Sequence, residues 1–179
     1  IKRGKKVIMK NYGQYPIVPV KGDGVYVWDA DDKKYIDFVA GISVNCLGYN
    51  NKDLNEAVSN QLAKIHHISN LYWMPPQIEL AELLVSNSGF DRAFFCNSGA
   101  EANEAALKLA KKYSFEKYGP ERNGIISMHQ SFHGRTMETL SLTGQKKYHE
   151  GFNPLTSDVS FAEFNNFDSV KSMVNENTC

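Results

Sequence analysis

The 179-residue sequence has few cysteines, no excess charge of either sign and no long hydrophobic run. Its three cysteines, Cys46, Cys96 and Cys179, are odd in number and far apart. They therefore exclude a disulfide framework and a Cys-x-x-Cys zinc or redox pair. This sparse use predicts a reducing, cytoplasmic compartment, in which each cysteine is a small buried hydrophobic residue.

Charge and hydropathy exclude further classes of partner. Lysine plus arginine total 20, and aspartate plus glutamate also total 20, so no basic face for nucleic acid is expected. The basic residues near the start are interpreted as a solvated terminus. No apolar run approaches the roughly 20 residues that span a bilayer, and no secretory-type segment opens the chain. We therefore expect neither a nucleic-acid partner nor a membrane partner.

The order of local patterns predicts an α/β protein. A three-stranded meander is expected first, with strands at residues 17–20, 25–28 and 34–38. Helical spacing follows over 54–65, with Asn51 or Asp53 as the cap. The later elements alternate: helix 77–85, strand 92–96, helix 100–118, strand 124–128, helix 136–142, strand 159–164 and a helix from 167. This alternation is typical of a parallel or mixed sheet covered by helices.

The segment around Ser98 leads from an expected strand into a helix. Gly99 and Ala100 would let an anion approach the free N–H groups of the first helical turn, and Ser98 adds a hydroxyl. Ser98 and Glu101 also form a capping-box pattern, which needs no ligand. Phosphate binding and simple capping both remain open here. Further along this helix, Glu104 is expected on the solvent face.

A second polar segment, residues 129–136, also follows an expected strand. Phe132 offers a flat face, Gly134 allows close approach, and Arg135 offers a planar fork for a carboxylate. Two histidines lie four residues apart in it, but the glutamate of His-Glu-x-x-His is missing, and no metal site is predicted. From these residues alone, a binding site and simple packing with a surface charge remain alternatives.

Taken together, the two segments resemble the class III, fold-type I aminotransferases, through FFCNSGAEANEAA at residues 94–106 and SFHGRT at 131–136. The resemblance covers essentially the whole chain, and the sequence of its motifs is most similar to the acetylornithine branch of the class. It implies a fold-type I pyridoxal-phosphate transferase. Residues 1–69 would be an N-terminal segment of meander plus helix, and residues 70–179 the first part of the large cofactor-binding α/β domain.

The resemblance implies a role for each matching residue. It assigns the cofactor, pyridoxal 5'-phosphate, to four residues: Ser98, Gly99, Ala100 and Phe132. The first three would hold the phosphate, and Phe132 would stack on the pyridine ring. Arg135 would bind the α-carboxylate of the substrate, with Tyr12 assisting. The lysine that forms the Schiff base and the aspartate that pairs with the pyridine nitrogen are expected beyond Cys179. No catalytic residue is therefore expected in this chain, which should be inactive by itself.

The parent enzyme implied by the resemblance moves the terminal amino group of N-acetylornithine to 2-oxoglutarate, a step of arginine biosynthesis, as a homodimer. Ornithine, 4-aminobutyrate and succinylated diamines are the alternative donors. Ornithine aminotransferases tend to have a tyrosine where Ile42 stands, which favours an acylated substrate. A non-catalytic phosphate-binding module is the alternative from another class.

Overall fold

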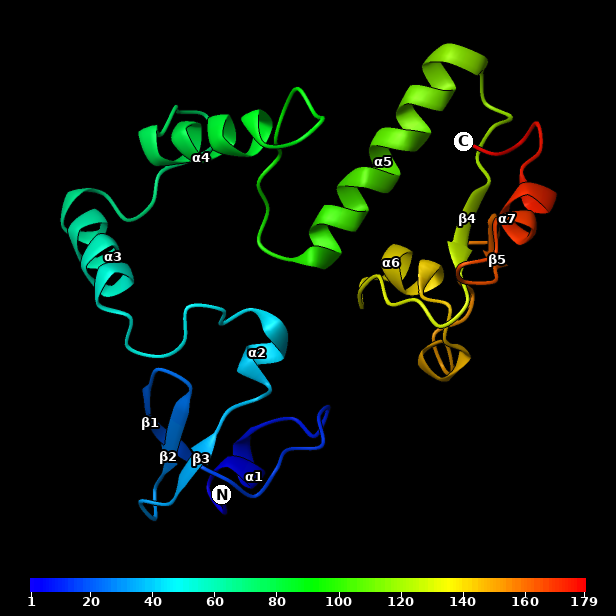
Figure 1. Cartoon of the computed structure of the whole chain (residues 1–179). Helices are drawn as coiled ribbons and strands as arrows, with labels where there is room; N and C mark the ends of the chain where they lie inside the picture. The colour runs from blue at the N-terminus through cyan, green and yellow to red at the C-terminus, as the bar shows by residue number, and fades with distance from the viewer. The chain divides into compact units, whose positions relative to one another are not determined.

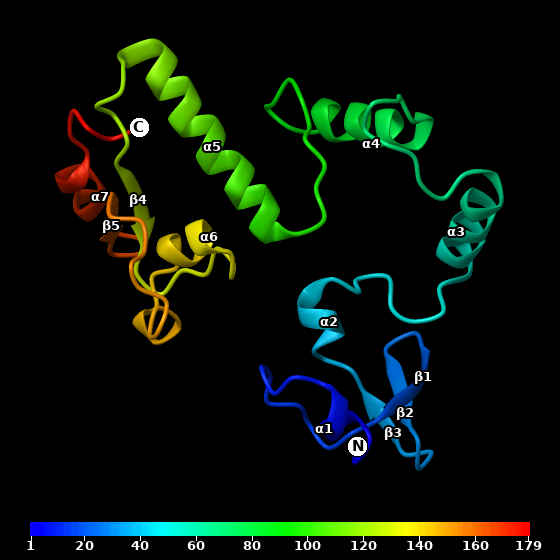
Figure 2. The same ribbon diagram turned by 180° about the vertical axis from the view of Figure 1, so that it is seen from behind.

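The computed structural model describes residues 1–179, which form two compact units, Ile1–Met74 and Pro75–Cys179 (Figures 1 and 2). The expected domain boundary, between residues 69 and 70, lies just before this division. That it separates domains of the whole protein remains a prediction. None of the helices is both long enough and apolar enough to cross a membrane.

The first unit contains the expected three-stranded meander. Strands β1 (Pro19–Asp23), β2 (Tyr26–Asp29) and β3 (Lys34–Ile36) pair antiparallel in that order. The first strand was expected over residues 17–20, but β1 extends to Asp23, because Gly22 and Asp23 still pair with β2. Gly24, at φ +54°, and the next residue are enough to reverse the chain, since glycine adopts a positive φ at little cost.

Helices α1 (Gly4–Val7), α2 (Ala40–Ser43) and α3 (Lys52–Lys64) complete this unit. Of the two proposed caps of α3, Asn51 is the one used: its side-chain oxygen accepts the N–H of Leu54 at 3.0 Å. The short α2 is irregular, because Ile42 lies in the left-handed region at φ 65° and ψ 57°. A β-branched residue is strained in that conformation.

Asp37 fixes the turn between β3 and α2. Its carboxylate accepts the N–H groups of Val39 at 2.9 Å and Ala40 at 3.1 Å, and the hydroxyl of Tyr49 at 2.6 Å. These bonds, the Tyr49 hydroxyl foremost, lower the pKa of Asp37 below its ordinary value, because they favour the charged carboxylate.

Tyr49→Phe is therefore expected to raise the pKa of Asp37 towards its ordinary value. A lowered folded-state pKa stabilises the fold above the unfolded-state pKa, and this stabilisation is lost as pH falls through the folded-state pKa. The variant should lose it at a higher pH than the parent. A carboxyl NMR titration of Asp37 measures the shift. Tyr35→Phe removes the hydroxyl that donates to Asp29 and should leave the pKa of Asp37 unchanged. An unchanged pKa of Asp37 in Tyr49→Phe would show that the Tyr49 hydroxyl does not lower it.

The second unit alternates strands and helices as expected from residue 99 onward. Its elements are α4 (Pro75–Ser86), α5 (Gly99–Tyr118), β4 (Ile125–Met128), α6 (Met137–Leu142), the 3-10 helix η1 (Lys146–Tyr148), β5 (Val159–Ala162) and α7 (Phe167–Met173). Strands β4 and β5 pair in parallel, from Ile125 beside Val159 to Met128 beside Ala162. In Figure 1, α6 follows the end of β4, and α7 lies beside β5.

Several sequence-based expectations are wrong in detail. Residues 92–96 form no strand, because no segment of this chain supplies a hydrogen-bonded ladder beside them. Helix α4 begins at Pro75 and not at residue 77, since proline is tolerated in a first helical turn, where its missing N–H would be unbonded anyway. Cys46 and Cys96 are exposed, so they are not the buried hydrophobic residues that were expected.

The most buried apolar side chains of the second unit come from α5, α6 and β5. They are Leu107, Leu140, Leu142 and Ala162. Every residue from Thr139 to Thr143 is buried as well. The segment at the end of α6 is therefore packed inside the second unit, close in sequence to the polar loop that follows β4.

Candidate functional site

The start of α5 forms the capping box that the sequence indicated. The Ser98 hydroxyl oxygen accepts the N–H of Glu101 at 3.2 Å, and the Glu101 carboxylate accepts the N–H of Asn97 at 2.5 Å. Two otherwise unbonded backbone donors are satisfied by these side chains. The capping interpretation is therefore confirmed.

Capping leaves the groups needed for anion binding free. The hydrogen bonds of the first turn begin with the N–H groups of Glu101 and Ala102, so those of Gly99 and Ala100 have no partner in the chain. A Cβ atom added to Gly99 meets no heavy atom within 4 Å. Ser98 acts as an acceptor in the cap, so its hydroxyl proton can still be donated. These residues fit a phosphate group at the positive end of the helix dipole.

Hydrogen bonds attach the second polar segment to α5. The Asn103 side-chain amide donates to the carbonyl of His133 at 2.8 Å, and the Thr136 hydroxyl donates to the Glu104 carboxylate at 2.5 Å. Between them lies Gly134, at φ +141°, where an added Cβ would be 2.8 Å from the Cβ of Ala100. The two motifs found in the sequence therefore meet, and Gly134 is required for their close approach.

The sequence did not identify the residues that join the motifs, although one signal was present. Ala100, Asn103, Glu104 and Leu107 follow the i, i+3, i+4, i+7 spacing of one helical face. Glu104, expected on the solvent face, is half-buried and bonded to Thr136. The expectation failed because a hydroxyl from a distant loop can satisfy a carboxylate as well as water does.

Buried and part-buried hydrogen bonds hold the loop that carries Phe132 and Arg135. The N–H of His133 donates to the Thr143 hydroxyl at 3.0 Å, and the N–H of Gly144 donates to the Ser131 hydroxyl at 3.0 Å. Ser127, at the centre of β4, donates to the carbonyl of Leu142 at 2.6 Å. Residues 131–136 are thus fixed to both β4 and the end of α6.

Phe132 and Arg135 lie together beside a third residue that the sequence did not indicate, Tyr148. The rings of Phe132 and Tyr148 meet edge to face, with centroids 6.0 Å apart and planes at 75°. The Arg135 guanidinium carbon is 4.4 Å from the Tyr148 centroid and 5.5 Å from that of Phe132. Arg135 is exposed and forms no ion pair within the chain, so its N–H groups can bind an external carboxylate.

Tyr12 is the one predicted site residue in the first unit, where its side chain is 72% exposed. Its assistance to Arg135 remains a prediction. The roles given to the residues of the second unit also rest on the resemblance, while their proximity is a property of the structure.

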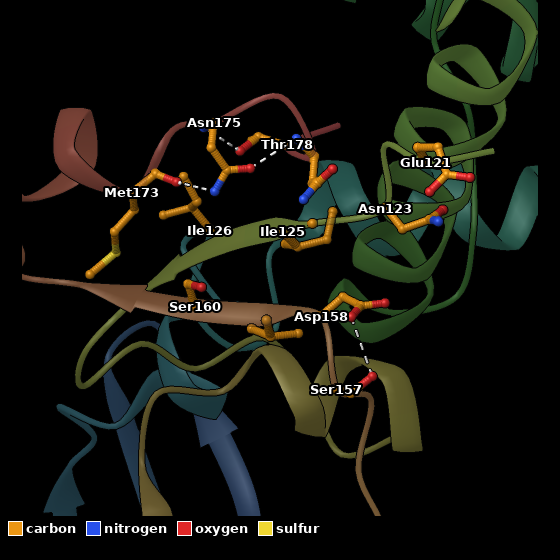
Figure 3. Close-up of a pocket in the computed structure, with 13 residues that line it drawn as sticks. Glu121, Asn123, Ile125, Ile126, Ser157, Asp158, Ser160, Met173, Asn175 and Thr178 are labelled. Carbon is orange, nitrogen blue, oxygen red and sulfur yellow. Dashed lines mark hydrogen bonds between the residues drawn. The ribbon is translucent and has the colours of Figure 1, made fainter. Parts of the chain in front are cut away.

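A separate cavity of about 440 Å³ opens at the other end of the sheet (Figure 3). Its polar lining includes Glu121, Asn123, Asp158 and Asn175, and it contains none of the predicted site residues. Ligands of open parallel sheets bind outside the carboxyl ends of the strands. The candidate site lies at that end, after β4, whereas this cavity lies where β4 and β5 begin.

Residues 7–179 match the family described as aminotransferase class-III. The chain is 48% identical over 175 residues to an acetylornithine aminotransferase from Caldanaerobacter subterraneus subsp. tengcongensis, covering 98% of this chain and 44% of the relative. It is 49% identical over 162 residues to a succinylornithine transaminase from Photorhabdus laumondii, covering 90% of this chain and 40% of that protein. The chain therefore spans less than half the length of these relatives.

Solved structures agree with this assignment. An omega-transaminase from Thermomicrobium roseum shares 33% identity at a TM-score of 0.81, over 89% of this chain and 39% of its own. An ornithine aminotransferase from Toxoplasma gondii has the same fold, with a TM-score of 0.92 at 24% identity over 99% of this chain and 42% of its own. The fold is that of the fold-type I transferases, and the chain belongs to the class-III aminotransferases, whose cofactor is pyridoxal 5'-phosphate.

Proposed function

We propose that the whole protein is an aminotransferase that moves the terminal amino group of N-acetylornithine to 2-oxoglutarate. The observation that carries the proposal is the junction of the two motifs, which joins a helix start with free N–H groups to a loop with an unpaired arginine. A relative that is 48% identical over nearly the whole chain is named acetylornithine aminotransferase.

In this proposal the start of α5 holds the cofactor. The N–H groups of Gly99 and Ala100 and the hydroxyl of Ser98 donate to its phosphate, and the dipole of a 20-residue helix favours that charge. Phe132, whose side chain is 55% exposed, supplies a flat apolar face for the pyridine ring. When bound, the cofactor supplies the electron sink for amino-group transfer.

Arg135 would bind the substrate carboxylate that is remote from the reacting carbon. In N-acetylornithine the transferred amino group and the α-carboxylate are at opposite ends of the carbon chain. 2-Oxoglutarate also carries a carboxylate remote from its reacting carbon. One arginine can therefore orient both substrates, because its planar N–H fork matches either carboxylate. Orientation by a group away from the reacting atoms lowers the barrier by removing unproductive poses.

Other features of the whole protein remain proposals. The lysine that would hold the cofactor is expected beyond residue 179, and Tyr12 is expected to assist Arg135. We propose a homodimer in the cytoplasm, acting in arginine biosynthesis.

The donor can be tested by steady-state kinetics of the whole protein. The kcat/KM for N-acetylornithine is expected to exceed those for ornithine and 4-aminobutyrate by at least about 10-fold, the scale of one specific contact. N-succinylornithine is the second candidate, because a succinylornithine transaminase is 49% identical to this chain. Ile42, in place of a tyrosine, supports an acylated donor.

Each alternative function predicts a different outcome of this experiment. A preference for free ornithine would contradict the acylated donor while leaving the aminotransferase assignment intact. Cofactor binding without transamination of any of the four donors would contradict the proposed function and favour a non-catalytic phosphate-binding module.

A further inference from the structure

We propose that Tyr148 is a positioning residue for Arg135, a role that rests on the proposed function. The Tyr148 ring is half-buried and contacts both residues assigned to ligands. It meets Phe132 edge to face at 6.0 Å, and the Arg135 guanidinium carbon lies 4.4 Å from its centroid. One side chain therefore links the ring expected beside the cofactor to the arginine expected on the substrate.

Tyr148 is itself held against the loop that carries Arg135. Its N–H donates to the carbonyl of Gln145 at 3.0 Å, and the Gln145 side-chain amide donates to the carbonyl of Ser131 at 3.1 Å. On its other side, the His149 ring nitrogen lies 2.7 Å from the carbonyl of Thr143. The segments that carry Tyr148 and Arg135 are thus joined through Ser131 and Thr143, so the ring lies beside a loop that is held in place.

The contact with Tyr148 leaves Arg135 able to bind a carboxylate. A guanidinium contacts an aromatic ring through its face, while its N–H groups lie in its own plane and stay available to a carboxylate. An exposed arginine without such support must give up side-chain freedom each time a substrate binds. Tyr148 would reduce this loss by holding Arg135 in place beforehand. The Lys147 ammonium, 4.7 Å from the same centroid, adds positive charge beside the ring.

The test replaces the ring in the whole protein. Tyr148→Leu is expected to raise KM for N-acetylornithine and for 2-oxoglutarate about 2- to 30-fold, the range of a cation–π contact, with kcat changed less than KM. Tyr148→Phe keeps the ring and should recover most of the parent KM. Tyr118→Leu is the matched control, because it removes a similar contact, with the Arg122 guanidinium carbon 4.3 Å from the ring, at the far end of α5.

A second readout does not need activity. The rate at which phenylglyoxal modifies Arg135, measured by peptide mapping, should rise in Tyr148→Leu and not in Tyr148→Phe. Tyr148→Met serves as the second ring-free variant if Tyr148→Leu unfolds. If the parent is active and the ring-free variants keep both its KM values and its phenylglyoxal modification rate, the proposal is overturned. If the parent does not catalyse transamination but the ring-free variants are still modified faster than the parent, the proposed function is overturned and the positioning role stands.

Discussion

Replacing Arg135 with lysine should raise KM for both N-acetylornithine and 2-oxoglutarate in the whole protein. A charge-assisted bond contributes about 1.5–3 kcal/mol, which corresponds to roughly 10- to 150-fold in KM. Lysine keeps the charge but lacks the planar fork, so it cannot form two parallel bonds to one carboxylate. Because Arg135 forms no ion pair within the chain, this loss reports on an external ligand.

Arg122→Lys makes the same chemical change elsewhere in the second unit and is the matched control. Arg122 also lies over a tyrosine ring, at 4.3 Å, but belongs to neither motif. Its replacement should leave both KM values within about 2-fold, as expected of residues outside a site. If Arg135→Lys left KM and kcat at parental values, Arg135 would be an ordinary surface charge.

Gly99→Val should weaken cofactor retention by at least about 10-fold, the loss of one charge-assisted hydrogen bond to the phosphate. The two methyl groups would occupy the space through which a phosphate reaches the N–H groups of Gly99 and Ala100. The fold should tolerate the change, because an added Cβ meets nothing within 4 Å at this position. The variant therefore separates ligand binding from stability.

Cofactor content after dialysis, measured by absorbance and by phosphate analysis, tests this prediction. Gly89→Val is the matched control, since Gly89 also has open space around an added Cβ and lies in the same unit outside both motifs. It should retain the cofactor at the parental level. Equal retention in the Gly99 and Gly89 variants would show that no phosphate approaches the start of α5.

Sequence patterns predicted the fold where local signals suffice. Asn51 caps α3 through a hydrogen bond to Leu54, and Gly24 permits the β1–β2 turn by adopting a positive φ, so both effects depend on residues close in sequence. The expected strand at 92–96 shows the limit of such patterns. Apolar, β-prone residues become a strand only when another segment supplies the ladder, and this is a property of tertiary structure.

The candidate site follows the same division. Both polar loops could be found from the residue types that follow expected strands. Their junction could not, because the bond between Asn103 and His133 spans 30 residues of sequence. The choice between capping and phosphate binding also required coordinates. Ser98 caps the helix as an acceptor, and the N–H groups of Gly99 and Ala100 remain free, so the two roles are compatible.

A crystal structure of the whole protein with pyridoxal 5'-phosphate and a carboxylate substrate analogue would show whether the start of α5 and Arg135 form the binding site. We expect phosphate oxygens about 2.7–3.2 Å from the backbone nitrogens of Gly99 and Ala100. We also expect the pyridine ring against Phe132 and the carboxylate of the analogue on Arg135. A phosphate bound elsewhere, for example in the cavity where β4 and β5 begin, with the start of α5 and Arg135 contacting only solvent, would contradict this expectation.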